Sequence, residues 1–156
     1  MRRVRGKPGA GIHQLPPQVA EALCEILGPA VRQVRLVPHS WYARIHGRMA
    51  ATTRPNVIFL RGSVAQFAAD PALVLHEYFH VIRQWRPRRL TRGGYLLECL
   101  RHGYRNNRFE CEARDFTAAH LPRMMALLRR RAVQLEGSAG DSRPAAVEGY
   151  GSRRSA

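Results

Sequence analysis

The chain has 156 residues and a formal net charge of +15 at pH 7, from 26 basic and 11 acidic residues. Its length suits one domain with a hydrophobic core, and no apolar run reaches the roughly 18 residues needed to cross a membrane. The three cysteines form no paired framework, and no apolar segment follows the basic N-terminus, so we expect reduced thiols, no secretory signal, no membrane insertion and a cytoplasmic protein.

The predicted elements describe a small α+β domain between two tails. We expect a flexible basic tail over residues 1–13, a folded domain over 14–136 and a disordered tail over 137–156. Apolar residues at helical spacing predict helices, and short β-branched runs predict strands. A proline at position 122 is expected to kink or restart the last helix. In chain order we expect a helix over 17–27, strands over 31–37, 42–50 and 57–60, a helical turn over 63–69, and helices over 71–85, 94–103, 107–120 and 124–135.

One pentapeptide, His-Glu-Tyr-Phe-His, matches the pattern HExxH and lies in an apolar stretch typical of a buried helix. Positions i and i+4 share one face of a helix, so His76 and His80 can direct two imidazoles at one metal ion. Glu77 can then act as general base on a water at the metal. Asp70 and Pro71, an N-cap residue and a first-turn proline, predict a helix start shortly before the motif. The alternative is a pair of core histidines hydrogen-bonded to the backbone.

A third ligand is needed, because catalytic zinc usually has three protein ligands and one open position. We expect the best candidates on a helix that begins at Asn107 and packs closely through the small Ala113. Glu110 and Glu112 lie about 200° apart around such a helix, so only one of them can face the metal. We prefer Glu110, whose alternative role is the N3 position of a capping box, and keep Glu112 and His102 as other candidates.

Two segments carry a resemblance to known families. HExxH followed by Phe109-Glu110-x-x-Ala113-x-x-Phe116 resembles the gluzincin metallopeptidases, in which a glutamate from a downstream helix completes a His, His, Glu zinc site. The same spacing is similar to that of the CAAX-processing peptidases, which are membrane enzymes. The run from Leu-Val-Leu-His to Val-Ile-Arg-Gln around the motif resembles short bacterial zincin-like domains, many of them linked to extracellular contractile injection systems.

The resemblance covers roughly residues 30–120. It implies a minimal zincin-like domain, in which a small sheet packs on the HExxH helix and two or three further helices. It also implies zinc at His76, His80 and Glu110, with Glu77 as the base. The implied function is a zinc metallopeptidase that hydrolyses peptide or protein substrates, and export by a specialised system is an alternative to a cytoplasmic location.

A peptidase also needs a hydrogen-bond donor for the transition state and a surface for its substrate. Tyr104 is the candidate transition-state stabiliser, with His102 and Arg105 in the same predicted turn. The strand over 57–60 could bind an extended peptide along its edge. Asp115 could orient a ligand histidine, although an exposed position is the more usual one for it.

Two other classes of function remain open. One is a noncatalytic zinc-binding module in a larger, phage-tail-like or secretion assembly. The other is a basic nucleic-acid-binding protein, since 26 basic residues would attract polyanions nonspecifically. The arginines are scattered and include no recognised binding motif, so we favour a solvated arginine-rich surface over a dedicated nucleic-acid face.

Overall fold

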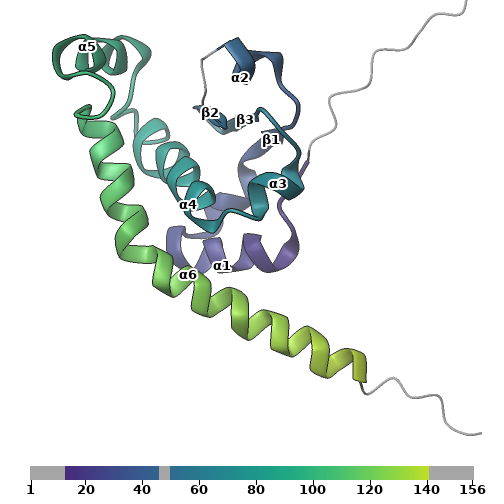
Figure 1. The fold of residues 1–156 in the computed structure, drawn as a ribbon. Coiled ribbons are helices and arrows are strands. Elements are labelled where there is room, and N and C mark those ends of the chain that lie inside the picture. Colours follow the sequence, from purple (N-terminus) through teal and green to yellow (C-terminus); the bar gives the residue numbers. More distant parts are fainter. Residues whose placement is uncertain (1–12, 46–49, 141–156) are drawn as a thin grey trace, which may run out of the picture.

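The computed structural model describes residues 13–45 and 50–140, which form an α+β domain (Figure 1). A small sheet lies on one side of helix α4, and the long helix α6 runs along the other side. The small α+β fold predicted from the sequence is confirmed. The helices are α1 (Pro17–Leu27), the 3₁₀ helix η1 (Pro29–Gln33), α2 (Trp41–Ile45), α3 (Val64–Ala68), α4 (Pro71–Phe79), the π-helix η2 (His80–Trp85), α5 (Arg92–His102) and α6 (Arg108–Gly140). The strands are β1 (Arg35–Val37), β2 (Ala51–Arg54) and β3 (Val57–Leu60).

The sheet has the order β1-β3-β2, with β1 parallel and β2 antiparallel to β3. A tight turn joins β2 to β3, and its Asn56 has a φ of 61°, a conformation that asparagine tolerates better than most residues. Because β3 is the middle strand, the prediction that residues 57–60 offer a free edge is wrong. The edge strands are β1, which His13 bridges at Leu36, and β2, which has no second strand partner among residues 13–45 and 50–140.

The first two predicted strands differ from the structure. Pro29 opens the 3₁₀ helix η1, so only the end of the expected strand over 31–37 is extended. The strand predicted over 42–50 begins instead as helix α2, while 46–49 lie outside the described residues and extended structure starts at Ala51. Packing outweighs strand propensity here. Helix α2 buries Ala43 and places the Tyr42 ring 5.1 Å from the Phe59 ring of β3.

The boundaries of the two predicted tails also shift. His13 forms an antiparallel bridge with Leu36, and residues 1–12 lie outside the described part of the chain. Helix α6 continues through Pro122 and past 137 to Gly140, so 137–140 are helical where disorder was expected, and 141–156 are not described. An internal proline removes a helix hydrogen bond and favours a kink. Figure 1 shows α6 bending part-way along its length.

Helix α4 forms the centre of the core. The Asp70 side chain accepts a hydrogen bond from the Leu73 amide at 3.0 Å, which confirms the predicted N-cap. Val74 and Leu75 of α4 are fully buried, as is Ala113 of α6, and the two helices pack against each other. Trp85 at the end of η2 donates from Nε1 to Thr53 Oγ1 at 3.1 Å, which ties the edge strand β2 to the motif helix. None of the described helices combines the length and the apolar character needed to cross a membrane.

Candidate metal centre

Three side chains from two helices converge on one point. His76 Nε2 lies 3.1 Å from His80 Nε2 and 3.3 Å from Glu110 Oε2, and His80 Nε2 lies 3.6 Å from Glu110 Oε1. His76 comes from the last turns of α4, His80 from the start of η2, and Glu110 from the first turn of α6. The three residues form a group that could hold a metal ion.

The spacing of these donors fits a tetrahedral ion. Zinc binds histidine nitrogen and carboxylate oxygen at about 2.0–2.2 Å, and two tetrahedral ligands at that distance lie roughly 3.3–3.6 Å apart. The observed separations of 3.1, 3.3 and 3.6 Å are close to this range. Two imidazoles and one carboxylate are also the ligand types of catalytic zinc sites, which leave one position open. The structure therefore supports a metal site at this point, with zinc a suitable ion for it.

Gln84 fixes the orientation of His80. Gln84 is fully buried, and its amide Nε2 donates to the Phe109 carbonyl at 3.0 Å and to Glu112 Oε2 at 3.2 Å. Both of those partners can only accept, so Gln84 Oε1 must face His80 Nδ1, 2.7 Å away. Nδ1 therefore carries a proton, which leaves Nε2 as the nitrogen that faces the other two ligands and can bind a metal. Hydrogen bonds of this kind orient metal-bound histidines and raise ligand basicity.

The backbone at His80 changes from α-helical to π-helical geometry, with the Arg86 amide donating to the Val81 carbonyl at 3.1 Å. Single π-turns of this kind are frequent at functional sites. The π-helix begins at His80 and includes Gln84, which donates a hydrogen bond to the Phe109 carbonyl of α6.

Glu110 is held in place by its own helix and by α5. The Asn107 side chain accepts a hydrogen bond from the Phe109 amide at 2.9 Å and caps the helix, while the Glu110 carboxylate points to the histidines. The Tyr95 hydroxyl of α5 donates to Glu110 Oε1 at 2.8 Å. Burial acts to raise the pKa of Glu110, but hydrogen bonds with His76, His80 and Tyr95 outweigh it and hold the pKa well below its usual range. Glu110 is therefore an anion in this site.

The contacts that lower the pKa of Glu110 raise the pKa of His80. Burial by itself lowers the pKa of His80, yet its hydrogen bond to Glu110 and the nearby carboxylates of Glu77 and Glu110 raise it above the ordinary value. Without a metal, a proton shared with Glu110 compensates the buried negative charge. A divalent cation placed among the three donors would take over that role.

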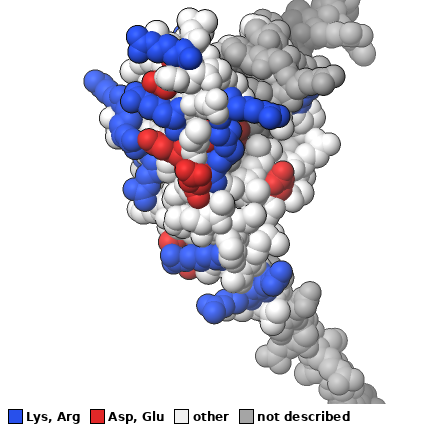
Figure 2. Space-filling model, turned by 60° about the vertical axis from the view of Figure 1, so that its left-hand side comes forward, with Lys and Arg blue, Asp and Glu red and all other residues white. Residues whose placement is uncertain are grey.

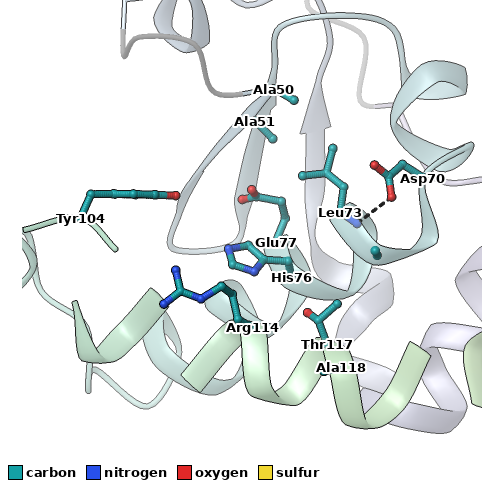
Figure 3. Close-up of a pocket in the computed structure, with 11 residues that line it drawn as sticks. Ala50, Ala51, Asp70, Leu73, His76, Glu77, Tyr104, Arg114, Thr117 and Ala118 are labelled. Atoms are coloured by element: carbon teal, nitrogen blue, oxygen red, sulfur yellow. Dashed lines mark hydrogen bonds between the residues drawn. The ribbon is translucent and has the colours of Figure 1, made fainter. Parts of the chain in front are cut away.

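Glu77 lies beside the donor cluster, where two cavities meet. The cavities have volumes of about 510 and 500 Å³, and both are lined by Ala51, Glu77 and Tyr104. Figure 3 shows the Glu77 carboxylate pointing into the first cavity next to His76, with the hydroxyl end of Tyr104 directed toward it. Glu77 is only 5% exposed, and burial raises its pKa although both histidines act to lower it.

Comparison with known proteins gives no relative of this chain. No protein-family model, curated protein or solved structure matches it. The function of the metal centre has therefore to be inferred from its residues.

The structure separates the predicted site residues into two groups. His76, His80, Glu110 and Glu77 lie together, and Tyr104 lines both cavities beside them. The other candidates do not face the cluster: His102, Arg105 and Asp115 are exposed, and Glu112 instead accepts hydrogen bonds from Gln84 and Arg89.

Three further residues at the centre were not predicted. Gln84 had a usable signal, because it lies four residues after His80 and so on the same helix face. Tyr95 and Arg114 had no such signal in the sequence, because only the folding of the chain brings them to the site. Arg114 lines the first cavity, and Figure 3 shows its guanidinium near His76 and below Tyr104.

Proposed function

We propose that this chain is a zinc-dependent metallopeptidase. The observation that carries the proposal is the convergence of His76, His80 and Glu110 at tetrahedral spacing, with a buried glutamate adjacent to them at the junction of two cavities. A structural zinc site would normally have four protein ligands and no cavity. Three donors beside open space favour a site that accepts a substrate.

The proposed chemistry divides between the ion and the protein. Zinc in such a site lowers the pKa of a bound water to about 7 and polarises a carbonyl oxygen. Glu77 accepts the proton of the attacking water and passes it to the leaving amine. Its raised pKa supports this role, because proton transfer is most efficient when the pKa of the group lies near the working pH.

Tyr104 is the proposed donor to the negatively charged oxygen that develops in the transition state. Burial and the neighbouring Glu110 raise the pKa of Tyr104 above its usual value, so its hydroxyl remains protonated and able to donate. Arg114 lines the same cavity as Tyr104 and adds positive charge there.

The substrate is proposed to bind along β2. This edge strand has no second strand partner in the described part of the chain, and all four of its residues line the second cavity together with Glu77 and His80. An extended peptide could add to that edge through backbone hydrogen bonds, which places its carbonyl groups in front of the donor cluster.

The experiment that tests the proposal combines metal content with turnover of a peptide mixture. We expect about one zinc ion per wild-type chain by mass spectrometry, a loss of zinc in Glu110→Ala, and zinc retained in Glu112→Ala as the matched control. Glu77→Gln should keep its zinc and lose roughly 10²–10⁴-fold in turnover, the usual contribution of a general base.

Two results would change the conclusion. Zinc with no hydrolysis of any peptide, and no effect of Glu77→Gln, would indicate a noncatalytic zinc-binding module. Absence of zinc from the wild-type chain, or equally tight binding by Glu110→Ala, would refute the metal centre itself.

A further inference from the structure

The second cavity extends from the donor cluster to a pair of arginines. Glu77, His80 and Glu110 line one part of it, and Arg54, at the end of β2, and Arg92, at the start of α5, also line it. The two arginines come from segments that are distant in sequence, and the fold brings both to the cavity.

The charge of these two arginines is not balanced by acidic side chains. Among the described residues, neither Arg54 nor Arg92 forms an ion pair. The acidic residues that line the cavity are Glu77 and Glu110, which belong to the proposed catalytic centre. Burial lowers the pKa of Arg54, and repulsion from Arg92 lowers it further, so the two positive charges act on each other.

Other described arginines do have acidic partners. Figure 2 shows basic side chains gathered over the upper part of one face of the molecule, with acidic side chains beside some of them. Arg89 pairs with Glu112 at 3.0 Å, and Arg108 lies 3.7 Å from Glu98. Arg54 and Arg92 thus combine two features, a position on a cavity wall and the lack of a carboxylate partner.

The Arg54 side chain is positioned by aromatic rings rather than by an anion. Its guanidinium carbon lies 5.2 Å from the centre of the Tyr42 ring and 6.0 Å from that of the Trp85 ring. Stacking of this kind orients the planar group and leaves its N–H donors free for a ligand. Trp85, Leu90 and Leu96 supply apolar cavity wall next to it.

We propose that Arg54 and Arg92 bind a carboxylate of the substrate, so that the enzyme selects peptides with an acidic group close to the scissile bond. Guanidinium groups match carboxylates through paired hydrogen bonds, and the apolar wall would contact the methylene groups that carry the acid. The carboxylate could belong to an aspartate or glutamate side chain, or to the C-terminus of a short peptide. This inference rests on the proposed peptidase function.

Peptide binding is measured with the zinc-loaded Glu77→Gln variant, so that the measurement does not depend on turnover. The probes are three N-terminally acetylated pentapeptides, each with two alanines on either side of a central residue. One has a central glutamate and an amidated C-terminus, one a central glutamine and a free C-terminal carboxylate, and one a central glutamine and an amidated C-terminus. We expect at least one carboxylate peptide to bind about tenfold or more tighter than the neutral peptide, as a charge-assisted hydrogen bond predicts. The tighter of the two identifies the source of the carboxylate.

The decisive variant is Arg92→Gln, because Arg92 is exposed and its loss leaves the core intact. It should remove most of the preference, and Arg54→Gln should do the same. The control replaces the exposed Arg35 and Arg101 with glutamine, which lowers the charge at two positions outside both cavities and should leave the preference unchanged.

Equal binding of the three peptides, no measurable binding of any of them, or a preference that survives in both Arg92→Gln and Arg54→Gln would overturn the assignment. The last result would mean that the carboxylate binds elsewhere, for example at the zinc ion. Hydrolysis of the same peptides by the chain with Glu77 intact is scored separately. An arginine-dependent preference without hydrolysis would refute the peptidase and keep the carboxylate site.

Discussion

Replacement of Gln84 by methionine tests whether the hydrogen bond behind His80 matters for the metal centre. Methionine has a similar length and volume, so it fills the fully buried position without a cavity. In the wild type, Gln84 Oε1 lies 2.7 Å from His80 Nδ1 and accepts its hydrogen bond, and Gln84 Nε2 donates to the Phe109 carbonyl. Methionine can form neither of these hydrogen bonds. The His80 ring then loses both its fixed tautomer and its fixed orientation.

The magnitude follows from the two interactions lost. Removal of the hydrogen-bond partner of a metal-bound histidine typically costs 10–100-fold in metal affinity, or about 1.4–2.7 kcal/mol. In the metal-free protein, the buried N–H of His80 left without an acceptor should lower the free energy of unfolding by about 1–3 kcal/mol. Zinc affinity is measured by competition with a chromophoric chelator, and stability by urea unfolding in the presence of a chelator.

The control is Gln18→Met, because Gln18 is an exposed residue of α1 far from the donor cluster in sequence. It should leave zinc affinity unchanged. If Gln84→Met binds zinc as tightly as wild type while His80→Ala does not, Gln84 has no part in orienting the ligand and this reasoning is wrong.

Two further predictions concern the helices that carry the ligands. Asp70→Ala removes the N-cap of α4 and should lower the free energy of unfolding by about 1 kcal/mol, whereas Asp115→Ala on an exposed face of α6 should change it by no more than about 0.5 kcal/mol in urea unfolding. Ala113→Leu adds volume at a fully buried position of α6, the helix that carries Glu110 and packs against α4, and should lower the free energy of unfolding by about 1–3 kcal/mol. It should also weaken zinc binding, because the extra volume moves Glu110 away from the two histidines. Ala119→Leu, exposed on α6, is its control, and an equal loss of zinc in both would contradict a role for close packing at this contact.

The helices were predicted from the sequence more accurately than the strands. Proline at the start and glycine after the end defined α1, and Asp70-Pro71 defined the start of α4, because capping depends on a few neighbouring residues. Residues 42–45, the described start of the strand predicted over 42–50, are helical instead, since their conformation depends on the contact of Tyr42 with Phe59 in another element. The position of β3 in the middle of the sheet could not be predicted either, as strand order depends on long-range pairing.

The sequence by itself determined the pair His76 and His80 and the adjacent Glu77, because helix periodicity places them on one side of a single element. It also narrowed the candidates for the third ligand to Glu110, Glu112 and His102. Only the tertiary structure distinguished them: the packing of α6 against α4 brings Glu110 within 3.3 Å of His76 and turns Glu112 toward Gln84 and Arg89. Local geometry repeats along the chain and can be read from spacing, whereas a contact between helices depends on side-chain shape and burial across the whole fold.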